Sequence, residues 1–310
     1  MTSDLHAQLA HLTTEAFRPE LADIDRLPTA EIVRLMNAED RSVPAAVATQ
    51  LPRIAAAIDA TAERMAGGGR LIYAGAGTAG RLGVLDASEC PPTFNAAPGQ
   101  VVGLIAGGPE AMAGAVEGAE DSASLAAGDL AALGLTPDDT VVGVSASGRT
   151  PYAVGAVAHA RALGALTIGL ACNTGSALVA AADHGIEVVV GPEFITGSTR
   201  LKAGTAQKLV LNMISTITMM RLGKTYGNLM VDVRATNDKL RARSRRIVAQ
   251  ATGASQPEID AALEATDGEV KPAILTLLAD IDAPTAERLL KESNGHLRKA
   301  LATATTTDTA

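Results

Sequence analysis

Between residues 70 and 190, short runs of apolar residues alternate with Ala-rich stretches of mixed polarity. Each run is continuously apolar, which is typical of strands buried on both faces of a parallel sheet. The predicted strands are Leu71–Ala74, Val101–Ala106, Thr140–Ser145, Leu166–Ala171 and Ile186–Val190. The predicted helices are Gly80–Ser88, Glu110–Ala132, Pro151–Leu163, Ser176–Ala182 and Arg200–Leu222. This alternation predicts an α/β fold with a doubly wound, five-stranded parallel sheet.

Helical patterns flank the alternating region on both sides. Apolar residues recur every three or four positions from Pro44 to Met65, which predicts one long helix with a packed face. The basic run from Lys239 to Arg246 is expected to be an exposed helical linker, followed by three short helices between residues 247 and 302. We therefore predict three parts: an N-terminal helical segment (1–65), an α/β domain (66–238) and a C-terminal helical region (239–310).

Composition and charge exclude several classes of protein. The chain has 310 residues, 47% hydrophobic and 19% charged, so a packed core rather than disorder is expected. Aromatic residues make up only 2%, too few for a surface that stacks nucleic-acid bases. A net charge of −8 repels nucleic acids and anionic membranes. With no leader-like start and no paired-cysteine motif, we expect a cytoplasmic protein without nucleic-acid or membrane partners.

A glycine-rich loop follows the first predicted strand and opens a helix. Its sequence, Gly75-Ala76-Gly77-Thr78-Ala79-Gly80, has the spacing of a dinucleotide-binding loop. Such a site also needs a carboxylate at the end of the second strand, but that strand ends Ile105-Ala106-Gly107-Gly108. The loop therefore favours a simple anion site, in which backbone N–H groups face a phosphate.

A second polar loop follows the third predicted strand. It reads Ser145-Ala146-Ser147-Gly148-Arg149-Thr150, and Pro151 then opens a helix. One Ser or Thr would be enough to cap that helix, so three hydroxyls in six residues exceed what capping needs. Hydroxyl and backbone N–H groups donate to phosphate oxygens without the burial of a lysine. We therefore predict a phosphate-binding loop.

These loops resemble a known family. The pattern Ser145-x-Ser147-Gly148-x-Thr150, together with Gly77-Thr78, resembles the phosphate loops of sugar isomerase (SIS) domains. Longer stretches resemble the N-acetylmuramic acid 6-phosphate etherase family: Gly75–Gly83, Asp86–Thr93, Ala115–Asp121 and Thr196–Lys208. This likeness extends over nearly the whole chain and implies an SIS-type, flavodoxin-like sandwich. Ala79 stands where the family usually has Ser.

The resemblance implies a lyase that removes the D-lactyl group from N-acetylmuramic acid 6-phosphate, without metal or other cofactor. It assigns catalysis to Glu89 and Glu120. Spacing alone does not select them, because Glu117 and Asp121 are expected to share a helix face with Glu120. The implied substrate-binding residues are Gly77, Thr78, Ser145, Ser147, Gly148, Thr150 and Ser198. The resemblance also implies a homodimer whose site lies near the subunit interface.

Further roles and functions stay open from the sequence. Arg200 and Lys202 either meet the lactyl carboxylate or begin a solvated helix, and Asp86 and Lys208 either orient the site or lie on a helix surface. The five histidines are scattered without metal-ligand spacing. Two other functions fit the same fold, a sugar-phosphate sensor similar to glucokinase regulatory protein and an SIS isomerase.

Overall fold

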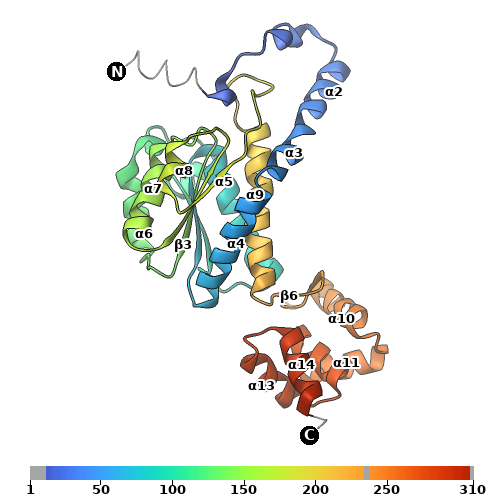
Figure 1. Cartoon of the computed structure of the whole chain (residues 1–310). Coiled ribbons are helices and arrows are strands. Elements are labelled where there is room, and N and C mark those ends of the chain that lie inside the picture. Colours follow the sequence, from blue (N-terminus) through green and yellow to red (C-terminus); the bar gives the residue numbers. More distant parts are fainter. Residues whose placement is uncertain (1–11, 234–237, 308–310) are drawn as a thin grey trace. The chain divides into compact units, whose positions relative to one another are not determined.

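The computed structural model describes residues 12–233 and 238–307. Within them lies one parallel sheet with the strand order β2-β1-β3-β4-β5 (Figure 1). Its strands are β1 (Leu71–Gly75), β2 (Val101–Ile105), β3 (Thr140–Ser145), β4 (Leu166–Ala171) and β5 (His184–Glu187). The predicted doubly wound, five-stranded parallel sheet is confirmed. Only the last strand is displaced from its predicted position: it begins two residues earlier than predicted, at His184.

Helices cover both faces of the sheet (Figure 1). One face carries α6 (Ala123–Ala132), α7 (Pro151–Ala162) and α8 (Ala177–Ala181), and the other carries α4 (Leu51–Ala66), α5 (Gly77–Phe94) and α9 (Lys202–Arg221). Side chains of β1 alternate between these layers. Ile72 packs with Leu130 and Tyr152 of the first layer, whereas Tyr73 donates its hydroxyl to Asp86 of α5 at 2.7 Å.

The N-terminal segment is less regular than the sequence pattern predicts. Short 3₁₀ turns, η1 (Thr13–Glu15), η2 (Pro19–Leu21) and η3 (Ile24–Arg26), precede α2 (Thr29–Asp40) and α3 (Ser42–Ala48). The single helix predicted from Pro44 to Met65 is wrong: α3 and α4 are separate. Pro52 has no N–H to continue α3 but fits the start of a new helix, which is where it lies in α4.

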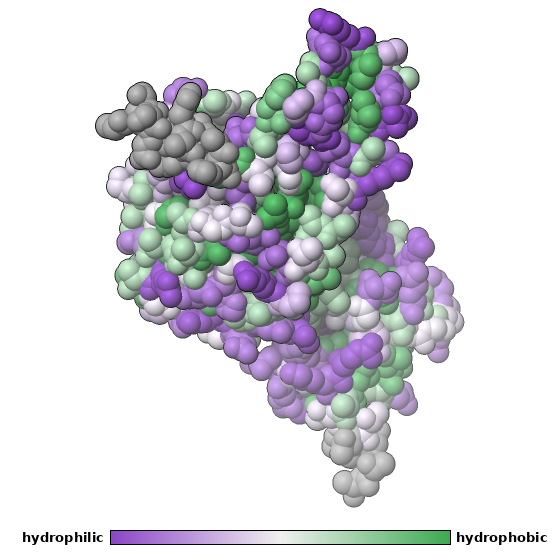
Figure 2. Space-filling model, turned by 45° about the horizontal axis from the view of Figure 1, so that its top comes forward, coloured by the Kyte–Doolittle hydropathy of each residue, from purple (hydrophilic) through white to green (hydrophobic). Residues whose placement is uncertain are grey.

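Helix α2 contributes little to the core. None of its residues is buried within the chain, and Val33 is 62% exposed. Phe17 and Leu27, which precede the helix, are exposed as well. Figure 2 shows hydrophobic surface, drawn in green, on this helix and the segment before it. A helix whose apolar residues are at most partly buried in its own chain has an apolar face available to a second chain.

Helix α5 is longer than predicted. The predicted end at Ser88 is wrong, because the helix continues through Pro91 and Pro92 to Phe94. The proline ring holds φ near the helical value, but each proline lacks the N–H that would donate to the carbonyl four residues earlier. Hydrogen bonding resumes directly afterwards, where Asn95 N donates to Pro91 O at 2.9 Å.

The described residues form two compact units. One comprises residues up to 88 with 99–215, and the other comprises 89–98 with the residues from 216 on. The domain boundaries at 65/66 and 238/239 stay predictions. The second unit contains the hairpin of β6 (Thr225–Tyr226) and β7 (Leu229–Met230), followed by α10 (Asp238–Thr252), α11 (Gln256–Ala265), α12 (Val270–Ala279), α13 (Ala283–Glu292) and α14 (Leu297–Thr307).

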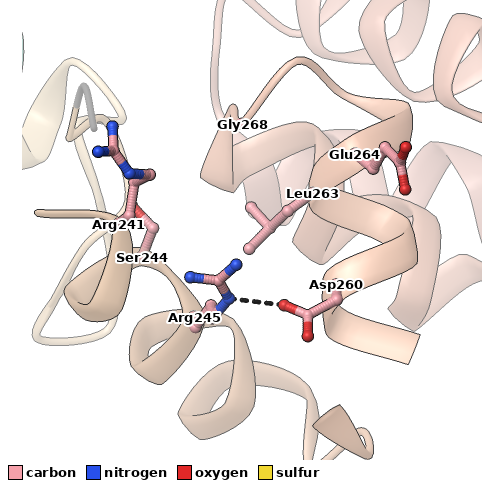
Figure 3. A pocket seen from close by; sticks show the side chains of 7 residues that line it. All are labelled: Arg241, Ser244, Arg245, Asp260, Leu263, Glu264 and Gly268. Carbon is pink, nitrogen blue, oxygen red and sulfur yellow. Dashed lines mark hydrogen bonds and ion pairs between the residues drawn. The ribbon is translucent and has the colours of Figure 1, made fainter. Parts of the chain in front are cut away.

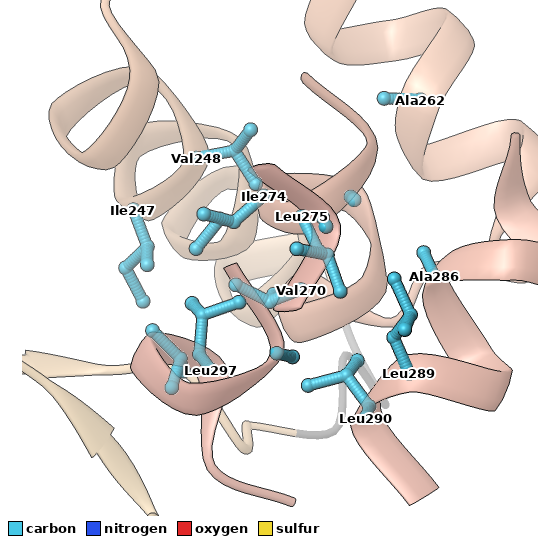
Figure 4. Close-up of a cluster of buried hydrophobic side chains, with 14 of the residues drawn as sticks. Ile247, Val248, Ala262, Val270, Ile274, Leu275, Ala286, Leu289, Leu290 and Leu297 are labelled. Carbon is cyan, nitrogen blue, oxygen red and sulfur yellow. The ribbon is translucent and has the colours of Figure 1, made fainter. Parts of the chain in front are cut away.

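The predicted count of three short helices between residues 247 and 302 is wrong. The sequence analysis missed the break between α13 and α14 at Asn294-Gly295. In the structure both residues have a positive φ, and this backbone conformation ends a helix. The basic run is exposed and helical, as expected, but α10 is more than a linker. Its Ile247 and Val248 pack with Ile274 and Leu297 in the core of this unit (Figure 4).

Candidate active site

Three hydroxyl groups meet in the loop after β3. Ser145 Oγ lies 2.8 Å from Thr150 Oγ1 and 3.2 Å from Ser147 Oγ, and Ser145 is 2% exposed. Ser145 Oγ also accepts from Gly148 N at 3.1 Å. A hydroxyl hydrogen can rotate toward a new acceptor, so this cluster can change from bonding itself to donating to an anion. We refer to Ser145–Thr150 as the hydroxyl loop.

Gly148 is required by the packing beneath this loop. Its φ is +68°, in the region that favours glycine. A Cβ on Gly148 would lie 2.3 Å from the Cβ of Ser176, which caps α8 by accepting from Val179 N at 3.2 Å. The hydroxyl loop therefore lies directly on the start of α8.

A cavity of about 160 Å³ opens beside the ends of β1 and β2. Gly77, Arg81 and Ala106 line one part of it, and Glu117 and Glu120 line another. The hydroxyl loop follows β3, which pairs with β1 in the sheet. The cavity and the hydroxyl loop therefore share the carboxyl edge of the sheet, where α/β folds bind their ligands.

The segment that carries Glu120 is not the helix we predicted from Glu110 to Ala132. It consists of two 3₁₀ turns, η4 (Pro109–Met112) and η5 (Ala119–Asp121), and helix α6 begins only at Ala123. Gly118 has a φ of +75°, and Ser122 caps α6 by accepting from Leu125 N at 3.1 Å. These two residues break the helix, so the predicted common face of Glu117, Glu120 and Asp121 is wrong.

Arg81 organises this cavity, and the sequence analysis gave it no role. Its Nε donates to Met112 O at 3.2 Å, and its Nη2 donates to Gly114 O at 2.9 Å. Among the residues that line the cavity it is the only cation. It therefore holds the 109–118 segment in place and sets a positive charge near the two glutamates.

The other predicted binding residues are spread more widely. Gly77 lines the cavity with a φ of +52°. The methyl group of Thr78 faces Gly204 of α9, where an added Cβ would lie 3.3 Å away. Ser198 lies in the loop before α9 and does not line the cavity.

Lys202 is unsuited to the role considered for it. It is buried, and its Nζ lies 2.9 Å from Glu39 Oε2. Its backbone N–H donates to Glu193 at 2.9 Å. The ammonium group already has a carboxylate partner, so the suggestion that Lys202 meets a substrate carboxylate is not supported by the geometry. Arg200 is exposed.

Asp86 is a buried residue that joins neighbouring elements by hydrogen bonds, and it does not lie on a helix surface. It is 7% exposed and accepts from Tyr73 Oη at 2.7 Å, Asn212 Nδ2 at 2.6 Å and Ser215 Oγ at 3.1 Å. Burial raises the pKa of its carboxyl group, and these three donors oppose that rise. Asp86 thus connects β1, α5 and α9, whereas Lys208 is exposed.

Asn173 went unnoticed in the sequence. Its Oδ1 accepts from Thr13 N at 2.8 Å and from Thr13 Oγ1 at 2.9 Å, while its Nδ2 donates to Ala146 O at 3.0 Å. It therefore ties the N-terminal segment to the hydroxyl loop. The only sequence signal was its place directly after a predicted strand, at the edge where ligands bind.

Glu89 lies on α5, twelve residues after Gly77 and so more than three turns along the helix. It is exposed, and it does not line the cavity of Glu120. Across residues 12–233 and 238–307, no group of three His, Cys, Asp or Glu residues is placed to hold a metal ion. His6 and His11 lie outside those residues. No helix in these ranges is long and apolar enough to cross a membrane.

Known proteins match the chain over nearly all of its length. Residues 53–161 match the glucokinase regulatory protein N-terminal SIS domain, and residues 119–217 match the SIS domain. An N-acetylmuramic acid 6-phosphate etherase from Streptomyces avermitilis is 78% identical over 97% of this chain and 96% of its own. The chain belongs to the N-acetylmuramic acid 6-phosphate etherase family.

Two further members of the etherase family show how far the similarity extends. The Streptomyces coelicolor protein is 78% identical over 97% of both chains, and the Rubrobacter xylanophilus protein is 62% identical over 95% of this chain and 97% of its own. The similarity therefore covers nearly the whole length of these relatives. Ala79 is 7% exposed in the first turn of α5.

Proposed function

We propose that this chain cleaves the D-lactyl ether of N-acetylmuramic acid 6-phosphate, releasing N-acetylglucosamine 6-phosphate and D-lactate. This reaction would serve the recycling of cell-wall amino sugars in the cytoplasm. Membership of the etherase family supports the reaction. The structural observation that carries it is the hydroxyl loop, which lies at the same sheet edge as a cavity lined by two glutamates.

The chemistry explains why such a site suits this substrate. An ether resists direct hydrolysis because an alkoxide leaves poorly. Opening the sugar ring exposes an aldehyde at C1, which acidifies the proton at C2. A base removes that proton while the lactyl oxygen leaves C3 with a proton from an acid, and water then adds to the double bond. The reaction needs a base, an acid and a fixed substrate.

We assign the fixing of the substrate to the hydroxyl loop and to Gly77 and Thr78, with Ser198 a further candidate. Ser145, Ser147, Gly148 and Thr150 would surround the 6-phosphate with hydroxyl and N–H donors. Glu120 would move the C2 proton or activate the incoming water. Glu89 would donate the proton to the departing lactyl oxygen, as the family resemblance implies.

We propose that the active form is a homodimer with its sites near the subunit interface. One observation supports this. Helix α2 has no fully buried residue, and apolar residues on and before it are exposed. The family resemblance assigns both Glu89 and Glu120 to one site, and a second copy of the chain could supply one of them.

The direct test is release of D-lactate from N-acetylmuramic acid 6-phosphate by the purified full chain. We expect lactate and N-acetylglucosamine 6-phosphate in equal amounts. The matched control is the double variant Glu89→Gln, Glu120→Gln, which keeps shape and hydrogen bonding but loses both carboxylates. Lactate release no greater than that of the double variant would refute the proposal. A sensor would bind the sugar phosphate without turnover, and an isomerase would interconvert aldose and ketose phosphates.

Replacing Ser147 by Ala is expected to raise KM about ten-fold and to change kcat little. We assign the Ser147 hydroxyl to binding the phosphate equally in the ground state and in the transition state. The loss of such an interaction raises KM and leaves kcat nearly unchanged. Steady-state kinetics of lactate release measures both constants. Ser124→Ala removes an exposed hydroxyl outside the site and is the control. A fall in kcat with unchanged KM would contradict the role given to Ser147.

A further inference from the structure

The second compact unit, which contains α10 to α14, has cavities of its own. One of about 490 Å³ lies between α10 and α11 (Figure 3). Arg241 and Arg245 line it from α10, opposed by Asp260 and Glu264 from α11, and Arg245 Nε lies 2.6 Å from Asp260 Oδ1. The charges of two cations and two carboxylates cancel, so this cavity has no preference for an ion of either sign.

A second cavity in the same unit has one sign of charge. It measures about 470 Å³ and lies among the end of α9, the β6–β7 hairpin and the start of α14. Arg221, Arg298 and Lys299 line it, together with His296, and none of its lining residues is Asp or Glu. We refer to it as the cationic cavity. Arg298 and Lys299 place positive charge on a concave surface, which attracts and concentrates anions.

The walls of the cationic cavity are held in place. The guanidinium of Arg298 lies 4.7 Å from the ring centre of Tyr226, a cation–π contact that orients it. The ring of His296 packs on Gly223, which has a φ of +74°. A Cβ on Gly223 would lie 2.9 Å from that ring, so any other residue would displace it.

One acidic residue of this unit, Asp232, is already paired with two lysines. Asp232 pairs with Lys224 and with Lys271, each at 2.8 Å. Burial lowers the pKa of His296, and the charges of Lys299 and Lys271 lower it further. A histidine that is disfavoured as a cation by neighbouring lysines indicates a positive potential at this position.

We propose that the cationic cavity binds a small phosphate-bearing molecule. Its volume falls within the range of small-molecule sites. Arg298 and Lys299 would contact the phosphate, and arginine suits its geometry. Ile217 and Met220, 37% and 44% exposed, would contact the body of the ligand. This site is separate from the hydroxyl loop, and the inference does not depend on etherase activity.

Binding of inorganic phosphate to the full chain by calorimetry tests this site. The background is Ser147→Ala, in which the hydroxyl loop is weakened. We expect one phosphate per chain, and we expect the added pair Arg298→Ser, Lys299→Ser to weaken it at least ten-fold. The control pair Arg288→Ser, Lys291→Ser removes two exposed charges from α13 and should change the affinity less than two-fold. Lys299→Glu alone, at an exposed position, serves as a second variant if the pair folds poorly.

Repeating the titration with N-acetylglucosamine 6-phosphate separates two sources of the ligand. Binding at least ten-fold tighter than inorganic phosphate identifies a sugar phosphate as the ligand, and equal affinity identifies the free ion. Both support the site if the Arg298 and Lys299 substitutions remove them. The proposal is overturned if phosphate binds equally well with and without these two cations, or if the α13 control weakens binding as much.

Discussion

Replacing Glu120 by Gln is expected to lower kcat for D-lactate release by about a thousand-fold, within the range that a general acid or base contributes. Glutamine has the same shape but cannot take or return a proton. Because the phosphate is held elsewhere in this proposal, the affinity for N-acetylglucosamine 6-phosphate should change less than three-fold. Stopped-time lactate assays and product titration measure the two effects.

Glu117→Gln is the matched control for this experiment. Glu117 lines the same cavity, three residues earlier and before the turn at Gly118. Its substitution removes the same charge from the same space and should lower kcat less than ten-fold. A thousand-fold loss with Glu117→Gln and none with Glu120→Gln would transfer the role to Glu117. Equal, small losses would leave this cavity without a catalytic carboxylate.

Mixing two inactive variants is expected to restore activity. If Glu89 and Glu120 of one site come from different subunits, a Glu89→Gln chain paired with a Glu120→Gln chain contains one intact site and one doubly altered site. Random pairing makes half of the dimers mixed, so co-expressed chains should show about a quarter of wild-type activity. Each variant alone should be nearly inactive. Lactate release by the co-purified mixture measures the recovery.

The matched control is co-expression of Glu120→Gln with the double variant Glu89→Gln, Glu120→Gln. No pairing of these chains contains an intact site, so activity should stay at background. If the mixture of single variants also stays at background, although distinguishable tags show that mixed dimers form, then both glutamates act from one subunit. The arrangement of the site proposed here would then be wrong.

The sheet was predictable because burial of a strand on both faces leaves a continuous apolar run in the sequence. Thr140–Ser145 and Leu166–Ala171 have the predicted bounds, and their neighbours differ by a few residues. The segment from Glu110 to Ala132 was not predictable from periodicity. Its alanines suit a helix, but Gly118 and the cap at Ser122 decide the local backbone.

The hydroxyl loop was predictable in part. Three hydroxyls after a buried strand indicated a cluster, and Ser145, Ser147 and Thr150 do lie together. The contacts of Arg81 and Asn173 were not predictable. Arg81 contacts a loop more than thirty residues later, and Asn173 contacts Thr13, which is separated from it by 160 residues. Contacts between such distant residues leave no periodic pattern along the chain.

The close fit of Gly148 against Ser176 has a consequence for engineering of this enzyme. Even a methyl group at position 148 would collide with the start of α8. Random substitution of Gly148 would therefore mostly yield misfolded chains. Residues 114–118 are exposed and line the cavity. New substrate preferences are therefore better sought by randomising that rim, where side chains can grow into solvent.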